Sequence, residues 1–343
     1  MDTSVAVFNA GLVTSVGLNV PASCAAIRVG LTNPTETRFV SSDGEWIMAH
    51  QVHLSEPWRG RAKLVRMLAR ALEECLVPVP RDSHGDIALL LCVAEPERPG
   101  RTEGLDRELL VETESMLGTR FHPVLSGTLA YGRVGALVAL ARARELLAEG
   151  ALKHVVIAAA DSLVVGPTLA TLDTAGRLLT PSNSNGFMPG EAAGALLVSS
   201  ARYATSSLIC SGLGFATERC TIATEEPLRA EGLTAAIKMA LDDARCQMGD
   251  LDFRITDNSG EQYYFREATL ALSRILRVRK ESFDMWHPAD CIGDVGAAIG
   301  IVSVAVALTS CRKRYTRGER ILLHFGTDSG HRGAAVLVYA GAA

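Results

Sequence analysis

The stretch Val295–Leu308 reads VGAAIGIVSVAVAL and is the longest apolar run of the chain. It is shorter than the roughly 20 residues that a membrane-spanning helix needs. Because its residues are apolar on every face of a helix, the helix is stable only where other elements surround it. The stretch therefore predicts a buried central helix packed against sheets, and it favours a layered α/β fold.

Around this helix, hydrophobic periodicity predicts nearly the same order of elements twice. The first half is expected to hold strands at Val5–Val16, Asp86–Val93, His154–Ala160 and Ala192–Ser199, and helices at Arg61–Cys75 and Val134–Glu149. The second half is expected to hold strands at Leu208–Phe215, Phe253–Thr256, Arg320–Phe325 and Ala334–Tyr339, and helices at Leu228–Ala244, Glu261–Leu276 and Gly296–Ser310.

An internal repeat of this length predicts two similar α/β halves related by a pseudo-twofold axis. We expect the halves, residues 1–200 and 201–343, to pack as an α-β-α-β-α sandwich, with the Val295–Leu308 helix inside it.

Composition limits the functions open to the chain. Its 343 residues carry a net charge of -4, which argues against nucleic acid as a partner because phosphate binding needs a concentrated basic surface. The eight cysteines form no CxxC pair and have no nearby histidine at metal-ligand spacing, so we expect no metal site and no cofactor. We expect a cytoplasmic protein with reduced thiols, since Asp2 and Asn9 interrupt any signal-peptide pattern and no stretch predicts a membrane span.

Five segments of the chain resemble the β-ketoacyl-acyl-carrier-protein synthases, which have the thiolase fold. The segment Asn185–Ala195, NGFMPGEAAGA, is similar to that family's Gly-Phe-x-x-Gly-Glu-Gly-Ala-Gly sequence, and Gly293–Gly300 is similar to its Gly-His-x-x-Gly-Ala-Ala-Gly helix start. The other similar segments are Val7–Gly17, Ala159–Ser162 and Phe325–Ala334. The resemblance covers nearly the whole chain and implies a thiolase-like fold. Glu191 is interpreted as structural, accepting backbone hydrogen bonds in the Gly-rich turn.

The nucleophile of such enzymes is a thiolate held at the start of a helix, where the helix dipole lowers its pKa. Counting back from Gly150, the expected end of the first-half helix, this position falls at Gly132 or Arg133. There is no cysteine between Cys92 and Cys210, so the expected nucleophile is absent.

The family also uses two histidines to stabilise the enolate oxygen. The resemblance places Ser259 and Asp294 at these two positions. A carboxylate at Asp294 would repel an enolate oxygen, so we predict that the chain has no ketosynthase activity and is a pseudoenzyme of this family.

A different chemistry stays open in the sequence. Ser126 or Ser259 could serve as an acyl acceptor with a nearby histidine such as His331 as the base, which would make the protein an acyltransferase or a hydrolase. A hydroxyl before a helix is, however, more often a cap or turn group than a nucleophile.

The resemblance also implies how a non-catalytic relative works. Ketosynthase-like proteins form dimers, and the resemblance implies that the first-half strand after the nucleophile helix pairs across the twofold axis. Non-catalytic relatives serve as the inactive partner of a ketosynthase, or as an adaptor or chaperone, for example in bacterial type VI secretion gene clusters. We therefore expect a homodimer, or a heterodimer with a thiolase-fold relative, that acts by binding other proteins, with the two roles left open.

Overall fold

The computed structural model describes residues 4–150, 152–203 and 205–341. Its strands are β1 (Val5–Val13), β2 (Thr35–Val40), β3 (Trp46–Ala49), β4 (Ala88–Cys92), β5 (Gly127–Leu129), β6 (His154–Ser162), β7 (Glu191–Ser200), β8 (Ser207–Thr217), β9 (Phe253–Thr256), β10 (Met285–Trp286), β11 (Arg320–Gly326) and β12 (His331–Ala340). Its helices are α1 (Val20–Arg28), α2 (Gly60–Leu76), α3 (Glu108–Leu117), α4 (Gly135–Ala148), α5 (Gly166–Thr174), α6 (Glu231–Asp243), α7 (Gln262–Ile275), α8 (Ala289–Ile292) and α9 (Ile299–Arg312).

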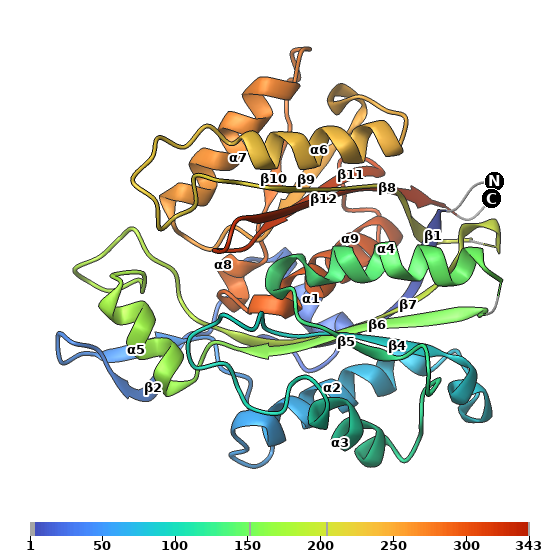
Figure 1. The fold of residues 1–343 in the computed structure, drawn as a ribbon, viewed down its shortest axis with the longest axis horizontal. Helices are drawn as coiled ribbons and strands as arrows, with labels where there is room; N and C mark the ends of the chain where they lie inside the picture. The colour runs from blue at the N-terminus through green and yellow to red at the C-terminus, as the bar shows by residue number, and fades with distance from the viewer. Residues whose placement is uncertain (1–3, 151, 204, 342–343) are drawn as a thin grey trace.

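These elements stack in five layers, as the sequence predicts (Figure 1). Helices α2 and α3 cover the outer face of the first half-sheet, and α6 and α7 cover the outer face of the second. Helices α4 and α9 fill the layer between the two half-sheets.

Each half-sheet has the same strand order. Within the described residues, ten strands form one mixed sheet in the order β10-β9-β11-β12-β8-β1-β7-β6-β4-β5. The strands of this sheet can be numbered in chain order within each half. Both halves then place them side by side in the order third, second, fourth, fifth and first, and the parallel and antiparallel pairings also match. A short antiparallel pairing of β1 with β8 joins the halves. The predicted repeat of two similar halves is therefore confirmed, while a domain boundary at residue 200 stays a prediction.

Helix α9 is the buried helix that the apolar stretch predicts. Every residue from Ile299 to Cys311 is buried. Gly300 lets α9 approach α4 closely, because a Cβ atom there would lie 2.6 Å from the Cβ atom of Ala136. Among the helices described, none is both long and apolar enough to cross a bilayer.

Four of the described strands were not predicted from the sequence. Strands β2 and β3 form a separate two-stranded sheet, and the edge strands β5 and β10 have only three and two residues and show no periodicity. The expectation that the strand after the nucleophile helix pairs across the twofold axis was wrong. The strand after helix α4 is β6, which pairs with β4 on one side and β7 on the other, so it has no free edge for a partner. The free edge of this half-sheet is β5, which comes before α4.

Candidate functional site

The candidate site lies where α4 and α9 begin. Each helix is preceded by one 3-10 turn, Gly132–Val134 before α4 and Gly296–Ala298 before α9. The first residue of each turn, Gly132 and Gly296, has a left-handed backbone with φ of 52° and 54°. The two turns are in contact, so the starts of both central helices meet at the carboxyl ends of β4, β5, β6 and β11, where ligands bind in many α/β folds.

Arg133 occupies the centre of this site and is 6% exposed. Its Nη1 donates to Asp294 Oδ2 at 3.1 Å, and its Nη2 donates to the Tyr264 hydroxyl at 2.7 Å and to Asp328 Oδ1 at 2.6 Å. Its Nε lies 3.6 Å from Asp257 Oδ2. Arg133 and Asp294, which the sequence analysis assigned to the nucleophile and to a histidine position, thus form an ion pair with each other.

The carboxylates around Arg133 differ in their tendency to ionise. Burial opposes the charge of Asp328, but the charges of Arg133 and Arg177 outweigh it and lower the pKa of this group. Burial raises the pKa of Asp257 to about 6, although Arg133 acts in the opposite direction. Arg177 also forms an ion pair with Glu261, with Nη2 2.7 Å from Oε2. The network is thus held by charge pairing around a buried guanidinium, with Asp257 and Asp294 buried and Asp328 44% exposed at its edge.

A second buried ion-pair cluster lies beside the first. Arg98 pairs with Glu95 Oε2 at 2.8 Å and with Asp161 Oδ2 at 2.6 Å. The same Asp161 oxygen accepts a hydrogen bond of 2.8 Å from the backbone N–H of Ala297, at the start of α9. A cavity of about 270 Å³ separates the two clusters, with Arg98, Arg133, Arg177 and Asp294 in its wall.

A thiol lies near this site but is not available for catalysis. Cys92, the last residue of β4, is completely buried, and a Cβ atom on Gly135 would lie 3.6 Å from its Sγ. Burial raises the pKa of this thiol to about 12, so it stays protonated and is a weak nucleophile at neutral pH. In the described residues, no group of three or more His, Cys, Asp or Glu side chains could hold a metal ion.

In the part of the chain that the structure describes, neither serine candidate forms a side-chain hydrogen bond with Arg133. Ser126 lies just before β5, at the end of that strand away from the cavity, and its Oγ accepts a hydrogen bond of 2.9 Å from the Leu89 N–H. The Ser259 Oγ is buried without a hydrogen-bond partner, and His331 is exposed at the start of β12. Across the described ranges, no hydrogen bond joins either hydroxyl to an imidazole.

Several members of the two clusters were not predicted from the sequence. Asp161 and Asp328 lie inside segments quoted for the family resemblance, so their position was signalled although their role was not. Nothing in the local sequence of Arg98, Arg177 or Tyr264 indicates that they meet.

Comparisons with known proteins establish the fold. No protein-family model matches the chain, and no curated protein is similar to it in sequence. Solved structures match it along nearly its whole length. A type II PKS acyl-carrier protein in complex with its ketosynthase (AntDE:AntF) matches at a TM-score of 0.79 and 14% identity, over 99% of this chain and 100% of that chain.

Two further matches are complexes of a ketosynthase with a chain length factor. The complex of ApeO with ApeC from Xenorhabdus doucetiae gives a TM-score of 0.75 at 14% identity, over 98% of both chains. The ishigamide ketosynthase/chain length factor gives 0.73 at 17% identity, over 98% of this chain and 100% of that chain.

The chain has the thiolase fold of the ketosynthases. Identities of this size establish the fold alone, because function resides in the site and not in the fold. Within the ketosynthase fold, the starts of the two central helices carry an ion-pair network in this protein.

Proposed function

We propose that this protein is a non-condensing member of the ketosynthase fold that acts as the inactive partner of a second thiolase-fold chain. The observation that carries the proposal is the guanidinium of Arg133, which fills the space between the two helix starts and is paired with Asp294 and Asp328. A substrate thioester would have to displace the Arg133 guanidinium from these carboxylates to reach the start of α4.

The electrostatics of the site also oppose condensation. An enolate oxygen needs hydrogen-bond donors or positive charge that is free to stabilise it. The positive charge of Arg133 is already neutralised by carboxylates, and Asp294 contributes negative charge. Around Arg133 the described residues therefore offer no thiolate and no unpaired positive charge for the reaction.

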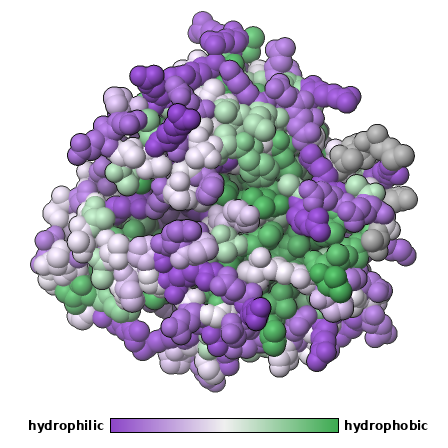
Figure 2. All heavy atoms as spheres, viewed as in Figure 1, coloured by the Kyte–Doolittle hydropathy of each residue, from purple (hydrophilic) through white to green (hydrophobic). Residues whose placement is uncertain are grey.

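The unpaired edge of β5 is the surface proposed for pairing. The Leu129 carbonyl accepts from the Val93 N–H, on the β4 side, so by alternation the backbone polar groups of Thr128 face the free edge. Two exposed apolar residues flank this edge, Val124 at 80% and Tyr131 at 45% exposure. Figure 2 shows apolar side chains gathered over the middle layer around α4, which follows β5 after the 3-10 turn Gly132–Val134. An exposed strand edge with apolar neighbours favours pairing with another chain.

The fold comparisons support a partner role more than an adaptor or chaperone role, because two of the matched structures are ketosynthases with a chain length factor. A serine-based acyltransferase or hydrolase gains no support from the hydrogen bonds of Ser126 and Ser259. We further expect the partner role to be carried out in the cytoplasm.

The proposal predicts that the protein forms no acyl-enzyme. After incubation with acetyl-CoA, malonyl-CoA or an acylated carrier protein, the intact mass is expected to stay unchanged, and malonyl-CoA is expected to keep its carboxylate. An active ketosynthase treated in parallel provides the control, since it gains the acyl mass. A stable adduct mapped to Ser126 or Ser259 and lost in the serine-to-alanine variant would contradict the proposal and support the serine-based alternative.

The proposed pairing predicts that charge at the β5 edge weakens association. The double variant Val124→Glu/Tyr131→Glu is expected to weaken pairing with a thiolase-fold partner, either a second copy or a relative. The dissociation constant of that dimer is expected to rise by at least about tenfold, because two carboxylates would enter an apolar contact. Light scattering after size-exclusion chromatography over a dilution series measures this constant. Val77→Glu is the matched control, because Val77 is 79% exposed and follows α2. Equal association of the double variant and the parent would exclude the β5 edge as the pairing surface.

A further inference from the structure

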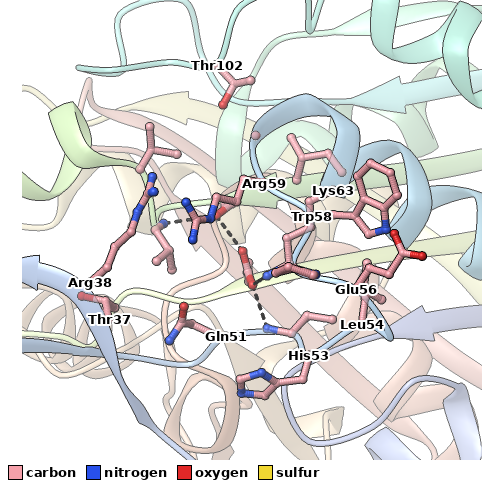
Figure 3. A pocket seen from close by; sticks show the side chains of 18 of the residues that line it. Thr37, Arg38, Gln51, His53, Leu54, Glu56, Trp58, Arg59, Lys63 and Thr102 are labelled. Atoms are coloured by element: carbon pink, nitrogen blue, oxygen red, sulfur yellow. Dashed lines mark hydrogen bonds and ion pairs between the residues drawn. The ribbon is translucent and has the colours of Figure 1, made fainter.

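A second, larger cavity of about 560 Å³ shares no described lining residue with the cavity beside Arg133. Strand β2, the segment 51–59 and the first turn of α2 form its walls, together with the ends of β6 and β7 (Figure 3). Its volume is in the range of small-molecule binding sites. The proposed function assigns no role to this cavity.

A neutral and fixed ion pair lies in the cavity wall. Glu191 forms an ion pair with Lys63, accepts a hydrogen bond of 2.7 Å from the Val52 N–H, and accepts one of 3.0 Å from the Ser162 hydroxyl. These contacts give Glu191 the structural role expected from the sequence, although its donors lie outside the Gly-rich turn. Because the charges of Lys63 and Glu191 cancel, neither is free to pair with a ligand.

Two other cations in the cavity wall have no carboxylate partner in the described part of the chain. Arg38 on β2 and Arg59 before α2 form no ion pair and no side-chain hydrogen bond within the described residues, and Arg38 lies over the Phe39 ring at 5.0 Å. Arg98, Arg133 and Arg177 of the neighbouring site are all paired. The cavity therefore holds two guanidinium groups that have not been neutralised.

The groups around these two arginines do not neutralise their positive charge. Figure 3 shows the two guanidinium groups pointing toward one another, with Glu56 drawn on the other side of the cavity. Helix α2 begins beside them and has no acidic residue in its first turn, so the positive end of its dipole adds to the potential. Thr37, Gln51 and Thr102 provide neutral polar groups in the same wall.

We propose that this cavity binds a small molecule carrying a phosphate group, with Arg38 and Arg59 pairing with the phosphate oxygens. A phosphate monoester carries between one and two negative charges at neutral pH, which matches two unpaired guanidinium groups better than a single carboxylate does. Arginine pairs with phosphate through two parallel hydrogen bonds, which gives the contact direction as well as charge. The Trp58 ring lies in the wall with the Arg66 guanidinium stacked on it at 3.1 Å, and it offers an apolar surface to the rest of the ligand.

Binding can be measured with inorganic phosphate, pyrophosphate and glycerol 3-phosphate as probes, at constant ionic strength maintained with sodium chloride. The chain has three tryptophans, and Trp58 lines the cavity, so a change in its emission reports on binding there. Titration calorimetry gives an independent measurement. We expect saturable binding with a dissociation constant of about 1 mM or lower. Tighter binding of glycerol 3-phosphate than of inorganic phosphate would identify an organic phosphate as the ligand class, and the reverse would identify free phosphate.

The variants make the assignment specific. Arg38→Gln/Arg59→Gln is expected to weaken binding by at least about tenfold, whereas Arg142→Gln, an exposed arginine on α4, is expected to leave it unchanged. Trp58→Phe is expected to remove the fluorescence change and to preserve the heat of binding. Both changed arginines are exposed, so an unaltered unfolding temperature will confirm that the double variant is folded. A signal that rises without saturation, or equal binding by the parent and the double variant, would overturn the proposal.

Discussion

Replacing Arg133 by methionine is expected to lower the free energy of unfolding by about 3–5 kcal/mol, because removing one partner of a buried ion pair leaves the other charges uncompensated. Asp257, Asp294 and Asp328 all lie around this guanidinium, and the Asp294 and Asp257 side chains are themselves 6% and 5% exposed. Methionine fills a similar volume, so the loss reports on charge more than on packing. Urea unfolding followed by circular dichroism measures the difference.

The loss is also expected to depend on pH. Burial raises the pKa of Asp257 to about 6 even beside Arg133, so loss of the guanidinium raises this pKa further. A group whose pKa is raised on folding stabilises the folded state at low pH and loses that contribution as the pH rises. The deficit of Arg133→Met is therefore expected to be smaller at pH 5 than at pH 8. The control is Arg142→Met, which breaks a solvent-exposed ion pair with Glu145 on α4 and is expected to cost less than about 1 kcal/mol. Equal costs for the two variants would show that Arg133 does not hold the centre of the site.

Replacing Gly296 by alanine is expected to destabilise the protein by about 3–5 kcal/mol, the cost of breaking a buried ion pair. The backbone of Gly296 is left-handed, and a Cβ atom there would collide with the Asp161 carboxylate and would lie 2.8 Å from Arg98 Nη1. The substitution must therefore separate Arg98 from Asp161, which also holds the first turn before α9 through the Ala297 N–H.

A second glycine separates the two contributions to this cost. Gly118, which ends α3, has a similar φ of 60°, but no atom lies within 4 Å of the place where its Cβ would be. Gly118→Ala is expected to cost only the left-handed backbone strain, about 1–2 kcal/mol. Thermal unfolding of both variants measures the difference. Similar losses would mean that the Asp161 carboxylate moves aside at little cost.

The sequence predicted the elements whose pattern is long and regular. Helix α9 was predicted because its 13 buried residues are small or apolar on every face, and α2 was predicted over Arg61–Cys75 from a repeating apolar face. Strand β9 was predicted with its exact ends, since Phe253–Thr256 stands between polar segments. By contrast, β5 and β10 exist because longer neighbouring strands offer them hydrogen bonds.

The candidate site was predicted in part. Arg133 was identified by counting back along the first central helix and Asp294 by the family resemblance, and the structure brings them within 3.1 Å although they are 161 positions apart in the chain. Ser259 was placed by the same resemblance and Ser126 by its position before the first central helix. Among the described residues, neither forms a hydrogen bond with the network, because a position in the sequence gives no side-chain direction in a loop.

By itself, the sequence determined which residues must be buried, that the chain repeats one α/β pattern, and that no cysteine stands at the start of α4. Hydrophobic periodicity carries this information because burial follows from the side chains along each element. Only the tertiary structure decided that Arg133 is neutralised by Asp294 and Asp328 whereas Arg38 and Arg59 are not. The physical reason is that an ion pair depends on a separation of a few ångströms, and such separations between distant segments are set by the packing of the layers.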